Sequence, residues 1–435
     1  MRQKSYHFLT LILIPLFWVI AFAAAGQSLP VGDAASLGLS EKRLQRLDAH
    51  MRRAVEDGVM VGGEAVIARR GQIAYRKTWG MSDREAREPT SPDTLYRIYS
   101  MTKPVTAVAM MMLYEEGRFQ LNDPLARHLP AFADLKVLEE ADDKDEPVLR
   151  DPARAPTIRD LMRHTAGMTY GVFGNTAVDH AYRDIGLLES PDLETFAQRL
   201  ASVPLQYDPG ERWHYSVAVD LQGRLVQVLS GMSFEDFLRE RIFQPLGMHD
   251  TAFVLSPEQL PRLAQLYSPE GTEISWNGEW QRSQSQTLEV ADPRLTEPFT
   301  EGGYFASGGA GLVSSTSDYL RFSQMLLNGG ELDGVRLLSP HTVAHMRRNH
   351  LSSDINDDTL RNVGGFGLGV AVTTDPGKTG EIGSPGSYGW GGAAGTRFWI
   401  DPREELIAIF MTQSVPHQTQ LGDQFRSLVY QALIE

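Results

Sequence analysis

The sequence predicts an α/β fold of the α+β type, built on one antiparallel sheet to which both ends of the chain contribute. Strand-forming runs lie at 65–79 near the N-terminus and at 366–412 near the C-terminus, whereas helical patterns dominate 157–255 between them. The simplest architecture consistent with these observations is a sheet flanked by the first and last helices, with a mostly helical region inserted between its N-terminal and C-terminal strands.

The elements near the N-terminus are a helix, a hairpin and a second helix. Ser40 is a suitable N-cap for an amphipathic helix that ends near Gly58. Two strand-forming runs, 65–69 and 72–79, follow it and are separated by an Arg-Gly pair, which indicates a hairpin. Residues 105–116 are strongly helical in composition and precede a glycine, where we expect the helix to stop.

The rest of the chain supplies further helices and the C-terminal strands. Helices are predicted over 157–164, 192–201, 219–229, 233–243, 316–327 and 420–433. Strands are predicted over 366–374, 388–400 and 405–412. Asn277-Gly278 would allow a further hairpin, and the acidic run Glu139–Glu146 is typical of a solvated loop. We therefore expect an α/β lobe formed by 32–99 and 361–435, and a helical lobe formed by 100–360.

The first residues have the pattern of a secretory signal peptide. Arg2 and Lys4 precede an apolar run that closes on Ala23-Ala24-Ala25-Gly26, so we expect residues 1–25 to be removed and 26–435 to form a single domain. An uncleaved membrane anchor is the alternative, because the apolar run is nearly long enough to span a bilayer. The chain contains no cysteine. A periplasmic or secreted protein without disulfides or stable membrane association is the simplest expectation.

Composition and missing motifs exclude several functions. The formal net charge of −14 disfavours nucleic acid and anionic membranes as partners. The 11 histidines show no H-E-x-x-H spacing, and neither a phosphate-binding P-loop nor a G-x-S-x-G nucleophile elbow occurs. We therefore expect no metal and no cofactor.

A candidate nucleophile lies at Ser100, with Lys103 three residues on, where a turn-rich stretch becomes helical. Residues i and i+3 are neighbours on a helix, so the Lys103 amine can lie beside the Ser100 hydroxyl. The helix N-terminus would add partial positive charge and free amides that favour an anionic intermediate. This spacing alone is weak, since about one such pair is expected by chance in a chain of this length. A surface serine with a solvated lysine is the alternative.

Tyr215 is a candidate base, although a lone tyrosine more often fills a hydrophobic core. It follows a turn at Asp208-Pro209-Gly210 and precedes a predicted helix, so a loop could present its phenol to Ser100. A phenol beside a desolvated ammonium loses its proton more easily, and the lysine does so as well. Either Tyr215 or Lys103 could then deprotonate the serine.

Three segments carry a family resemblance: Ser100-Met101-Thr102-Lys103, Tyr215-Ser216-Val217 and Gly389-Trp390-Gly391-Gly392-Ala393. In this order they resemble the motifs of the serine β-lactamase-related superfamily, in particular the class C-like family VIII carboxylesterases. The segments 164–168 and 308–314 support the resemblance, which covers the chain from about Ser40 to the last helix. It implies a β-lactamase/transpeptidase-like fold.

The resemblance also implies roles for individual residues. Ser100 would be the acyl-accepting nucleophile, Lys103 its proton partner and Tyr215 the general base. The backbone amides of Ser100 and Ala393 would form the oxyanion hole. The substrate would lie against four further residues, Trp390, Gly391, Gly392 and Val217.

The third motif and the residue after Ser216 depart from the class C β-lactamase pattern. Val217 replaces an asparagine, and Trp390-Gly391-Gly392 replaces Lys-Thr-Gly. Both changes remove groups that would recognise an anionic lactam, and they favour neutral esters. Lys378-Thr379-Gly380 spells the lactamase motif, but it lies in a predicted loop, so we do not expect Lys378 to contact substrate.

Four other residues near these motifs have a structural interpretation beside a functional one. We expect His164 to be a structural turn residue rather than a base. Tyr170, Phe173 and Phe305 are candidates for an acyl pocket, although ordinary core packing is the simpler explanation for each of them.

The expected function is therefore hydrolysis of short-chain carboxylic esters through an acyl-Ser100 intermediate. The alternatives on the same fold are a β-lactamase or D-alanyl carboxypeptidase, an acyltransferase, and a non-catalytic ligand-binding protein.

Overall fold

The protein is described by a computed structural model that covers residues 28–139, 148–273, 281, 283–352, 355, 364–417 and 419–435. The predicted signal peptide, the Asn277-Gly278 turn and all but the first residue of the acidic run Glu139–Glu146 lie outside the described residues. Within the described part of the chain, no helix is long and apolar enough to cross a membrane.

A seven-stranded antiparallel sheet forms the centre of the fold, in the order β12-β13-β14-β15-β1-β2-β3. Its strands are β1 (Gly62–Arg69), β2 (Gln72–Asp83), β3 (Glu88–Pro89), β12 (Ala371–Val372), β13 (Tyr388–Gly391), β14 (Arg397–Asp401) and β15 (Leu406–Thr412). N-terminal β1 pairs with C-terminal β15 along its length, from Gly63↔Thr412 to Arg69↔Leu406. The prediction of one sheet assembled from both ends of the chain is confirmed.

Two of the predicted C-terminal strands are wrong in detail. Residues 388–400 do not form one strand but the hairpin β13–β14, because the chain reverses at a turn that includes Gly395 in the left-handed region at φ 88°. Only Ala371–Val372 of the predicted strand 366–374 joins the sheet. Glycines interrupt that segment, and Gly369 takes a positive φ of 81° that a strand cannot contain.

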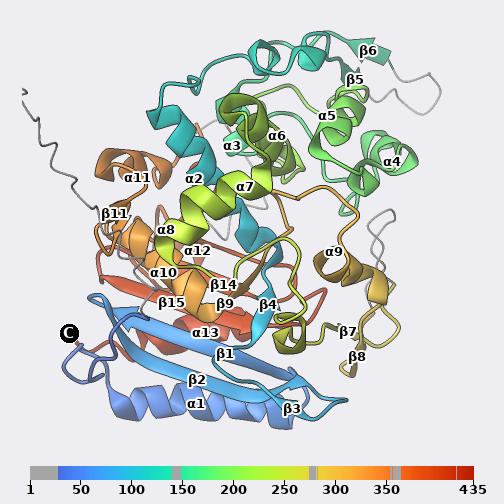
Figure 1. The fold of residues 1–435 in the computed structure, drawn as a ribbon. Helices are drawn as coiled ribbons and strands as arrows, with labels where there is room; N and C mark the ends of the chain where they lie inside the picture. The colour runs from blue at the N-terminus through green and yellow to red at the C-terminus, as the bar shows by residue number, and fades with distance from the viewer. Residues whose placement is uncertain are drawn as a thin grey trace, which may run out of the picture.

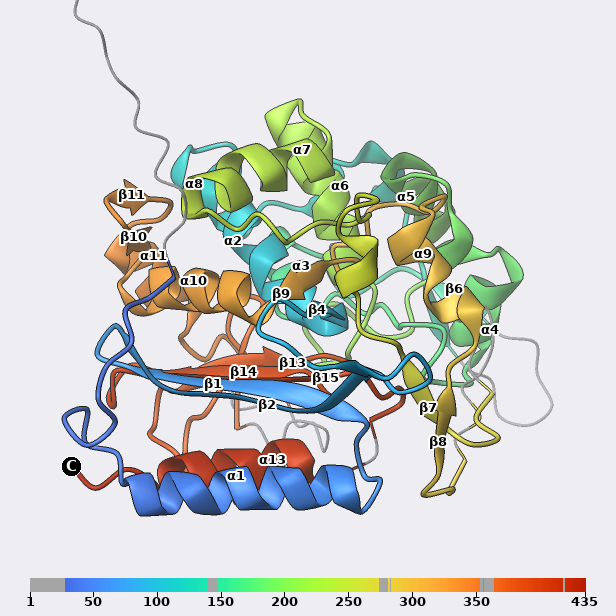
Figure 2. The ribbon, with the colours of Figure 1, turned by 60° about the horizontal axis from the view of Figure 1, so that its bottom comes forward.

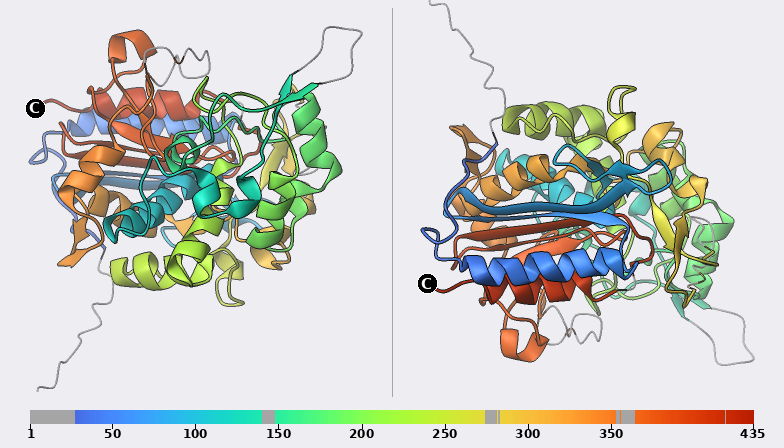
Figure 3. Two further views of the ribbon diagram at one scale, coloured as in Figure 1. Left: turned by 90° about the horizontal axis from the view of Figure 1, so that it is seen from above. Right: turned by 90° about the horizontal axis from the view of Figure 1, so that it is seen from below.

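Helices cover both faces of the sheet (Figure 2). On one face, α1 (Glu41–Glu56) and α13 (Leu421–Tyr430) lie side by side, as the view from below also shows (Figure 3). Their buried side chains, among them Leu47 and Phe425, form a separate core with the sheet. On the other face, α10 (Thr316–Leu327) packs against β1, β14 and β15.

Most of the remaining helices form a second region beyond α10 (Figure 1). They are α2 (Thr102–Glu115), α3 (Ile158–Met162), α4 (Ala177–Asp184), α5 (Leu193–Ala201), α6 (Ala218–Ser230), α7 (Phe234–Leu238), α8 (Gln244–Leu246), α9 (Glu297–Thr300) and α11 (Pro340–Met346). The short helix α12 (Pro376–Thr379) does not belong to this region, because it lies in the connection between the edge strands β12 and β13. A π-helical turn, Arg239–Phe243, joins α7 to α8. Helix α2 is the centre of this region, since every residue from Thr102 to Leu113 is buried.

Eight short strands complete the fold as two-residue or three-residue pairs. They are β4 (Leu95–Arg97) with β9 (Val313–Ser315), β5 (Val137–Glu139) with β6 (Val148–Arg150), β7 (Tyr267–Pro269) with β8 (Leu288–Val290), and β10 (Glu331–Leu332) with β11 (Val335–Arg336). The β4–β9 pair bears on the site, because β4 leads directly into the candidate nucleophile.

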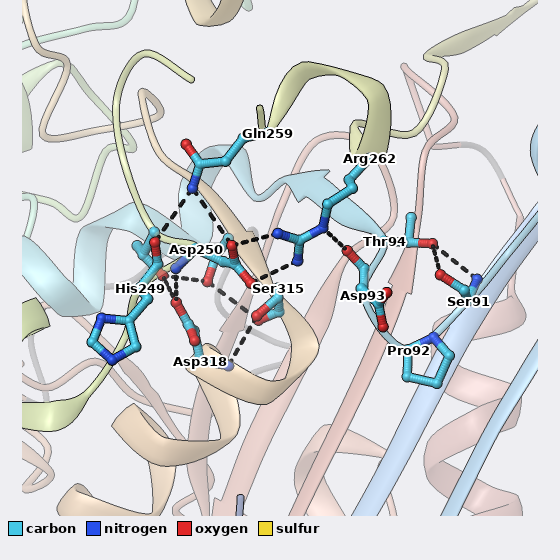
Figure 4. A network of polar contacts seen from close by, with 12 residues as sticks. Ser91, Pro92, Asp93, Thr94, His249, Asp250, Gln259, Arg262, Ser315 and Asp318 are labelled. Carbon is cyan, nitrogen blue, oxygen red and sulfur yellow. Dashed lines mark hydrogen bonds and ion pairs between the residues drawn. The ribbon is translucent and has the colours of Figure 1, made fainter. Parts of the chain in front are cut away.

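A polar network fastens the segment after α8 to the start of α10 (Figure 4). Arg262 forms two hydrogen bonds to the Asp250 carboxylate, at 2.7 and 2.6 Å, and another to the backbone oxygen of Asp93. The buried Asp318 carboxylate accepts hydrogen bonds from the Asp250 amide and the Thr251 hydroxyl. Burial raises the pKa of Asp318 to about 6. This carboxyl group therefore binds its proton more tightly in the folded state than an exposed aspartate does.

Candidate active site

Ser100 lies in a single 3-10 turn, Tyr99–Met101, between β4 and α2. Tyr99 has a φ of 43°, which is uncommon for a residue with a side chain, and its buried ring packs edge-on against Phe299 at 5.5 Å. Strained backbone of this kind is often found at functional sites, where the surrounding packing holds it. Here it places the Ser100 side chain at the entrance to α2.

Lys103 is buried directly behind the serine. Its side-chain amine donates a hydrogen bond to the Ser100 hydroxyl at 3.3 Å and another to the Gly309 carbonyl oxygen at 2.8 Å. The amine also lies 4.5 Å from the centre of the Tyr215 ring and 5.3 Å from that of Tyr170. The structure therefore brings Ser100 and Lys103 together as the sequence predicts.

Tyr215 reaches the same serine from the loop before α6. Its hydroxyl is 2.7 Å from the Ser100 hydroxyl oxygen, within a hydrogen bond. Its ring packs among the rings of His164, Tyr170, Phe173, Trp213 and Trp390. This aromatic surround fixes the phenol at Ser100 and limits its contact with water, so a proton can pass between the two oxygens without rearrangement.

The strand β13 and the turn after it border Ser100 from the sheet side. A Cβ atom at Gly392 would lie 2.4 Å from the Ile98 carbonyl oxygen, so only glycine allows the turn to approach the nucleophile segment this closely. Ser100, Trp390, Gly391, Gly392 and Ala393 line one cavity of about 520 Å³. The predicted oxyanion residues Ser100 and Ala393 thus face the same space.

Val217 does not line this cavity, although the sequence predicts that it contacts substrate. Its side chain is fully buried in the main core, and it precedes the first turn of α6 with its amide bonded to the Thr169 carbonyl oxygen. The residue two positions after Tyr215 therefore points into the protein, where an apolar side chain is needed.

Lys378 lies outside the site, as the sequence predicts. It belongs to the short helix α12, its side chain is 85% exposed, and its amine lies 3.8 Å from the Asp375 carboxylate. It lines neither of the two large cavities. The Lys-Thr-Gly spelling at 378–380 is therefore a coincidence of sequence.

Asp220 is a buried acid that sequence reasoning missed. It lies in the first turn of α6, and its carboxylate accepts hydrogen bonds from the Gly309 amide at 3.0 Å and the Ser307 hydroxyl at 2.5 Å. Burial raises its pKa, and the nearby Lys103 ammonium partly opposes that rise. Asp220 thereby positions Gly309, whose carbonyl holds Lys103. In the sequence, only its position five residues after Tyr215 indicates that Asp220 could lie near the active site.

His164 is structural, in agreement with the sequence interpretation. It adopts a φ of 56°, lies buried among aromatic rings, and its Nδ1 is 3.2 Å from the Ser216 hydroxyl. Burial lowers the pKa of His164 well below its usual value, and the neighbouring Lys103 lowers it further. The imidazole is therefore neutral at pH 7 and supports the Tyr215 ring by packing.

A second cavity, of about 430 Å³, lies next to the first and is mainly apolar. Of the three candidates for an acyl pocket, Tyr170 and Phe305 line this second cavity, whereas Phe173 lines the cavity of Ser100. The Tyr170 and Phe173 rings are in contact, with centres 4.9 Å apart. These two side chains therefore form part of the partition between the cavities. Among the described residues, no cluster of histidines and carboxylates could hold a metal ion.

Comparison with known proteins identifies the family. Residues 47–431 match the family model described as Beta-lactamase. An uncharacterized protein of Mycobacterium tuberculosis is 35% identical over 85% of this chain and 89% of its own. Esterase EstB of Burkholderia gladioli is 32% identical over 88% of this chain and 92% of its own.

A solved structure shows the same architecture. EstCE1, described as a hydrolase with promiscuous acyltransferase activity, superposes with a TM-score of 0.72 at 26% identity, over 91% of this chain and 99% of its own. The chain belongs to the β-lactamase family, which confirms the resemblance seen in the three motifs and the β-lactamase/transpeptidase-like fold. Family membership and the similarity to two esterases or hydrolases support a serine hydrolase.

Proposed function

We propose that the protein is a serine carboxylesterase that cleaves uncharged esters of short carboxylic acids through an acyl-Ser100 intermediate. The observation that carries the proposal is the convergence of the Lys103 amine and the Tyr215 hydroxyl on the Ser100 hydroxyl, at 3.3 and 2.7 Å. A serine needs such a basic partner to act as a nucleophile at neutral pH.

The reaction proceeds in two steps at the same atoms. In the first, Tyr215, assisted by Lys103, takes the Ser100 proton while the serine oxygen bonds to the ester carbonyl carbon. The tetrahedral oxyanion is stabilised by the Ser100 and Ala393 amides, and its collapse releases the alcohol, which receives the proton. In the second, water attacks the acyl-serine by the reverse proton path, which frees the acid and restores Ser100.

The absence of a cation in the place of the lactamase lysine supports an ester rather than a lactam substrate. Trp390 occupies that place, packed against Tyr215 at 5.8 Å and Phe366 at 5.4 Å between ring centres. A tryptophan offers an apolar surface and cannot pair with the carboxylate that conventional β-lactams carry.

The decisive experiment is a substrate panel on the purified protein. It should contain 4-nitrophenyl esters of two to eight carbons and a chromogenic cephalosporin, with Ser100→Ala as the control. We expect turnover of the short esters that Ser100→Ala abolishes, and little turnover of the cephalosporin. Preferred hydrolysis of the cephalosporin would overturn the proposal in favour of a β-lactamase.

Acyl transfer to an alcohol is a second candidate, favoured by the described activity of EstCE1. An acyl-Ser100 intermediate can pass its acyl group to an alcohol as well as to water. Addition of methanol or a longer alcohol to the ester assay would reveal it, because transfer yields a new ester at the expense of free acid.

We also propose that the protein is exported, on the strength of the basic and apolar pattern of residues 1–25. Expression of the full chain in a Gram-negative host, followed by fractionation and mass determination of the N-terminus, tests this. A product that retains residues 1–25 and stays in the cytoplasm would contradict it.

A further inference from the structure

The cavity that contains Ser100 has a second, ionic end. Besides the serine, Tyr215 and Trp390, its lining includes four charged side chains, Glu381, Arg397, Asp423 and Arg426. They come from three parts of the chain: the loop before β13, the strand β14 and the helix α13. A substrate that extends from Ser100 along β13 would meet them.

These four side chains are paired with one another. Arg397 lies 3.0 Å from the Glu381 carboxylate and also pairs with Asp423, while Arg426 lies 3.4 Å from Glu381. Arg426 also donates hydrogen bonds to the Ile382 carbonyl oxygen and the Ser387 hydroxyl. Two guanidinium groups thus face two carboxylates, so this end of the cavity carries no net charge.

The remaining imidazole in the cavity lining does not change this balance. His417 lines the same cavity, and burial lowers its pKa to about 4, so it is neutral at pH 7. Its ring nitrogen lies 3.1 Å from the Thr419 hydroxyl. The charge at this end is therefore set by Glu381, Asp423 and the two arginines.

Paired arginines act differently on a substrate than free ones. A free guanidinium is well shaped to bind a carboxylate with two hydrogen bonds. A substrate carboxylate that entered here would have to displace an existing partner and would lie close to two like charges, after losing its own hydration. An uncharged group meets none of these costs.

We propose that Glu381 and Asp423 determine the charge specificity of the cleft. By pairing Arg397 and Arg426 they restrict the ionic end to uncharged parts of the substrate, and removal of either acid converts that end into a carboxylate-binding site. This inference rests on the proposed esterase function and defines its substrate class further.

The test compares Glu381→Gln and Asp423→Asn with the wild-type protein. Two substrate pairs place a carboxylate on opposite sides of the ester: the mono-4-nitrophenyl ester of adipic acid against 4-nitrophenyl hexanoate, and 4-acetoxybenzoate against 4-acetoxybenzamide. The measured quantity is the ratio of kcat/KM for the anionic and the neutral member of each pair. Glu331→Gln, which removes a carboxylate from a surface ion pair with Arg336, is the matched control.

We expect the ratio for one pair to rise about five- to tenfold in both variants at low salt, and to fall back in 0.5 M NaCl, since an exposed attraction is screened. The pair that responds shows whether the acyl or the alcohol side occupies the ionic end. Glu331→Gln should leave both ratios unchanged.

The outcomes separate the inference from the proposed function. If both ratios stay within twofold of the wild-type values while the neutral esters are still hydrolysed, the inference is overturned and the esterase proposal stands. If the wild-type protein hydrolyses no neutral ester, the esterase proposal is overturned, and the inference is overturned as well because it rests on that proposal. Should Glu381→Gln not fold, Asp423→Asn decides alone, because its side chain is 65% exposed and tolerates substitution better.

Discussion

Lys103 and Lys378 both belong to segments that match an active-site motif in sequence, but their surroundings in the structure are opposite. Lys103 is buried, held by the Gly309 carbonyl and the Ser100 hydroxyl, and has the buried Asp220 carboxylate behind Gly309. Lys378 is exposed and pairs loosely with Asp375. A buried amine is oriented and desolvated, whereas a solvated one is neither. The position of a lysine in the fold, and not the match of its segment to the motif, therefore decides whether it can take part in catalysis.

The strongest test of this contrast replaces each lysine by alanine. Lys103→Ala should lower kcat for a short 4-nitrophenyl ester by about a thousandfold or more, because Ser100 loses a proton partner. Lys378→Ala should change kcat by less than twofold. Steady-state kinetics with matched thermal melts measures both, and a large loss in Lys378→Ala would reverse the assignment.

The second test uses two tyrosines whose rings both face Lys103. Only the Tyr215 hydroxyl bonds Ser100, so Tyr215→Phe should reduce kcat by about a hundred- to ten-thousandfold, the usual range for loss of a general base. Tyr170→Phe, which removes the hydroxyl of a residue that lines the second cavity, should lower kcat less than fivefold. Equal losses in the two variants would contradict a specific role of the Tyr215 hydroxyl in proton transfer.

The third test compares the aspartates beside the two lysines. Asp220→Asn should lower kcat about tenfold, because the Gly309 amide and the Ser307 hydroxyl lose the carboxylate that positions the Gly309 carbonyl oxygen at Lys103. Asp375→Asn should leave kcat unchanged. An unchanged kcat in Asp220→Asn would show that the carboxylate does not position Lys103.

The smallest expected effect concerns stability at a buried carboxyl that is distant from both lysines. The folded pKa of Asp318, about 6, lies above the unfolded value of 3.8, so the folded state binds the proton more tightly. Stability from this group is present at low pH and is lost as pH rises from about 4 through 6. The Asp318→Asn variant has no ionisable group at this position, so it does not lose this stability as the pH rises.

Thermal or urea unfolding at pH 4.5 and 7.5 measures this difference. Relative to the wild type, Asp318→Asn should gain up to about 2 kcal/mol on going to the higher pH, because pH 4.5 already lies above the unfolded pKa of 3.8 and part of the loss has occurred there. A difference between variant and wild type that is the same at both pH values would contradict the assignment.

Local patterns in the sequence determined much of the fold and the reacting groups. Helical spacing and strand-forming runs predicted α1, the β1–β2 hairpin, α10 and α13, because amphipathic elements show which face they bury. The Ser100 and Lys103 pair was predictable for the same reason, since residues three apart on one turn are neighbours. The resemblance of three short motifs supplied Tyr215 and the strand of Trp390.

Tertiary structure alone decided which side chains meet across long stretches of chain. The Lys103 bond to Gly309 joins residues 206 positions apart, and Asp220 reaches the same glycine from a third segment. Local periodicity carries no information on such contacts. The burial of Val217, the reversal that makes β13 and β14 a hairpin, and the pairing of Arg397 with Glu381 and Asp423 likewise depend on how distant segments pack. These contacts set the shape and charge of the cleft.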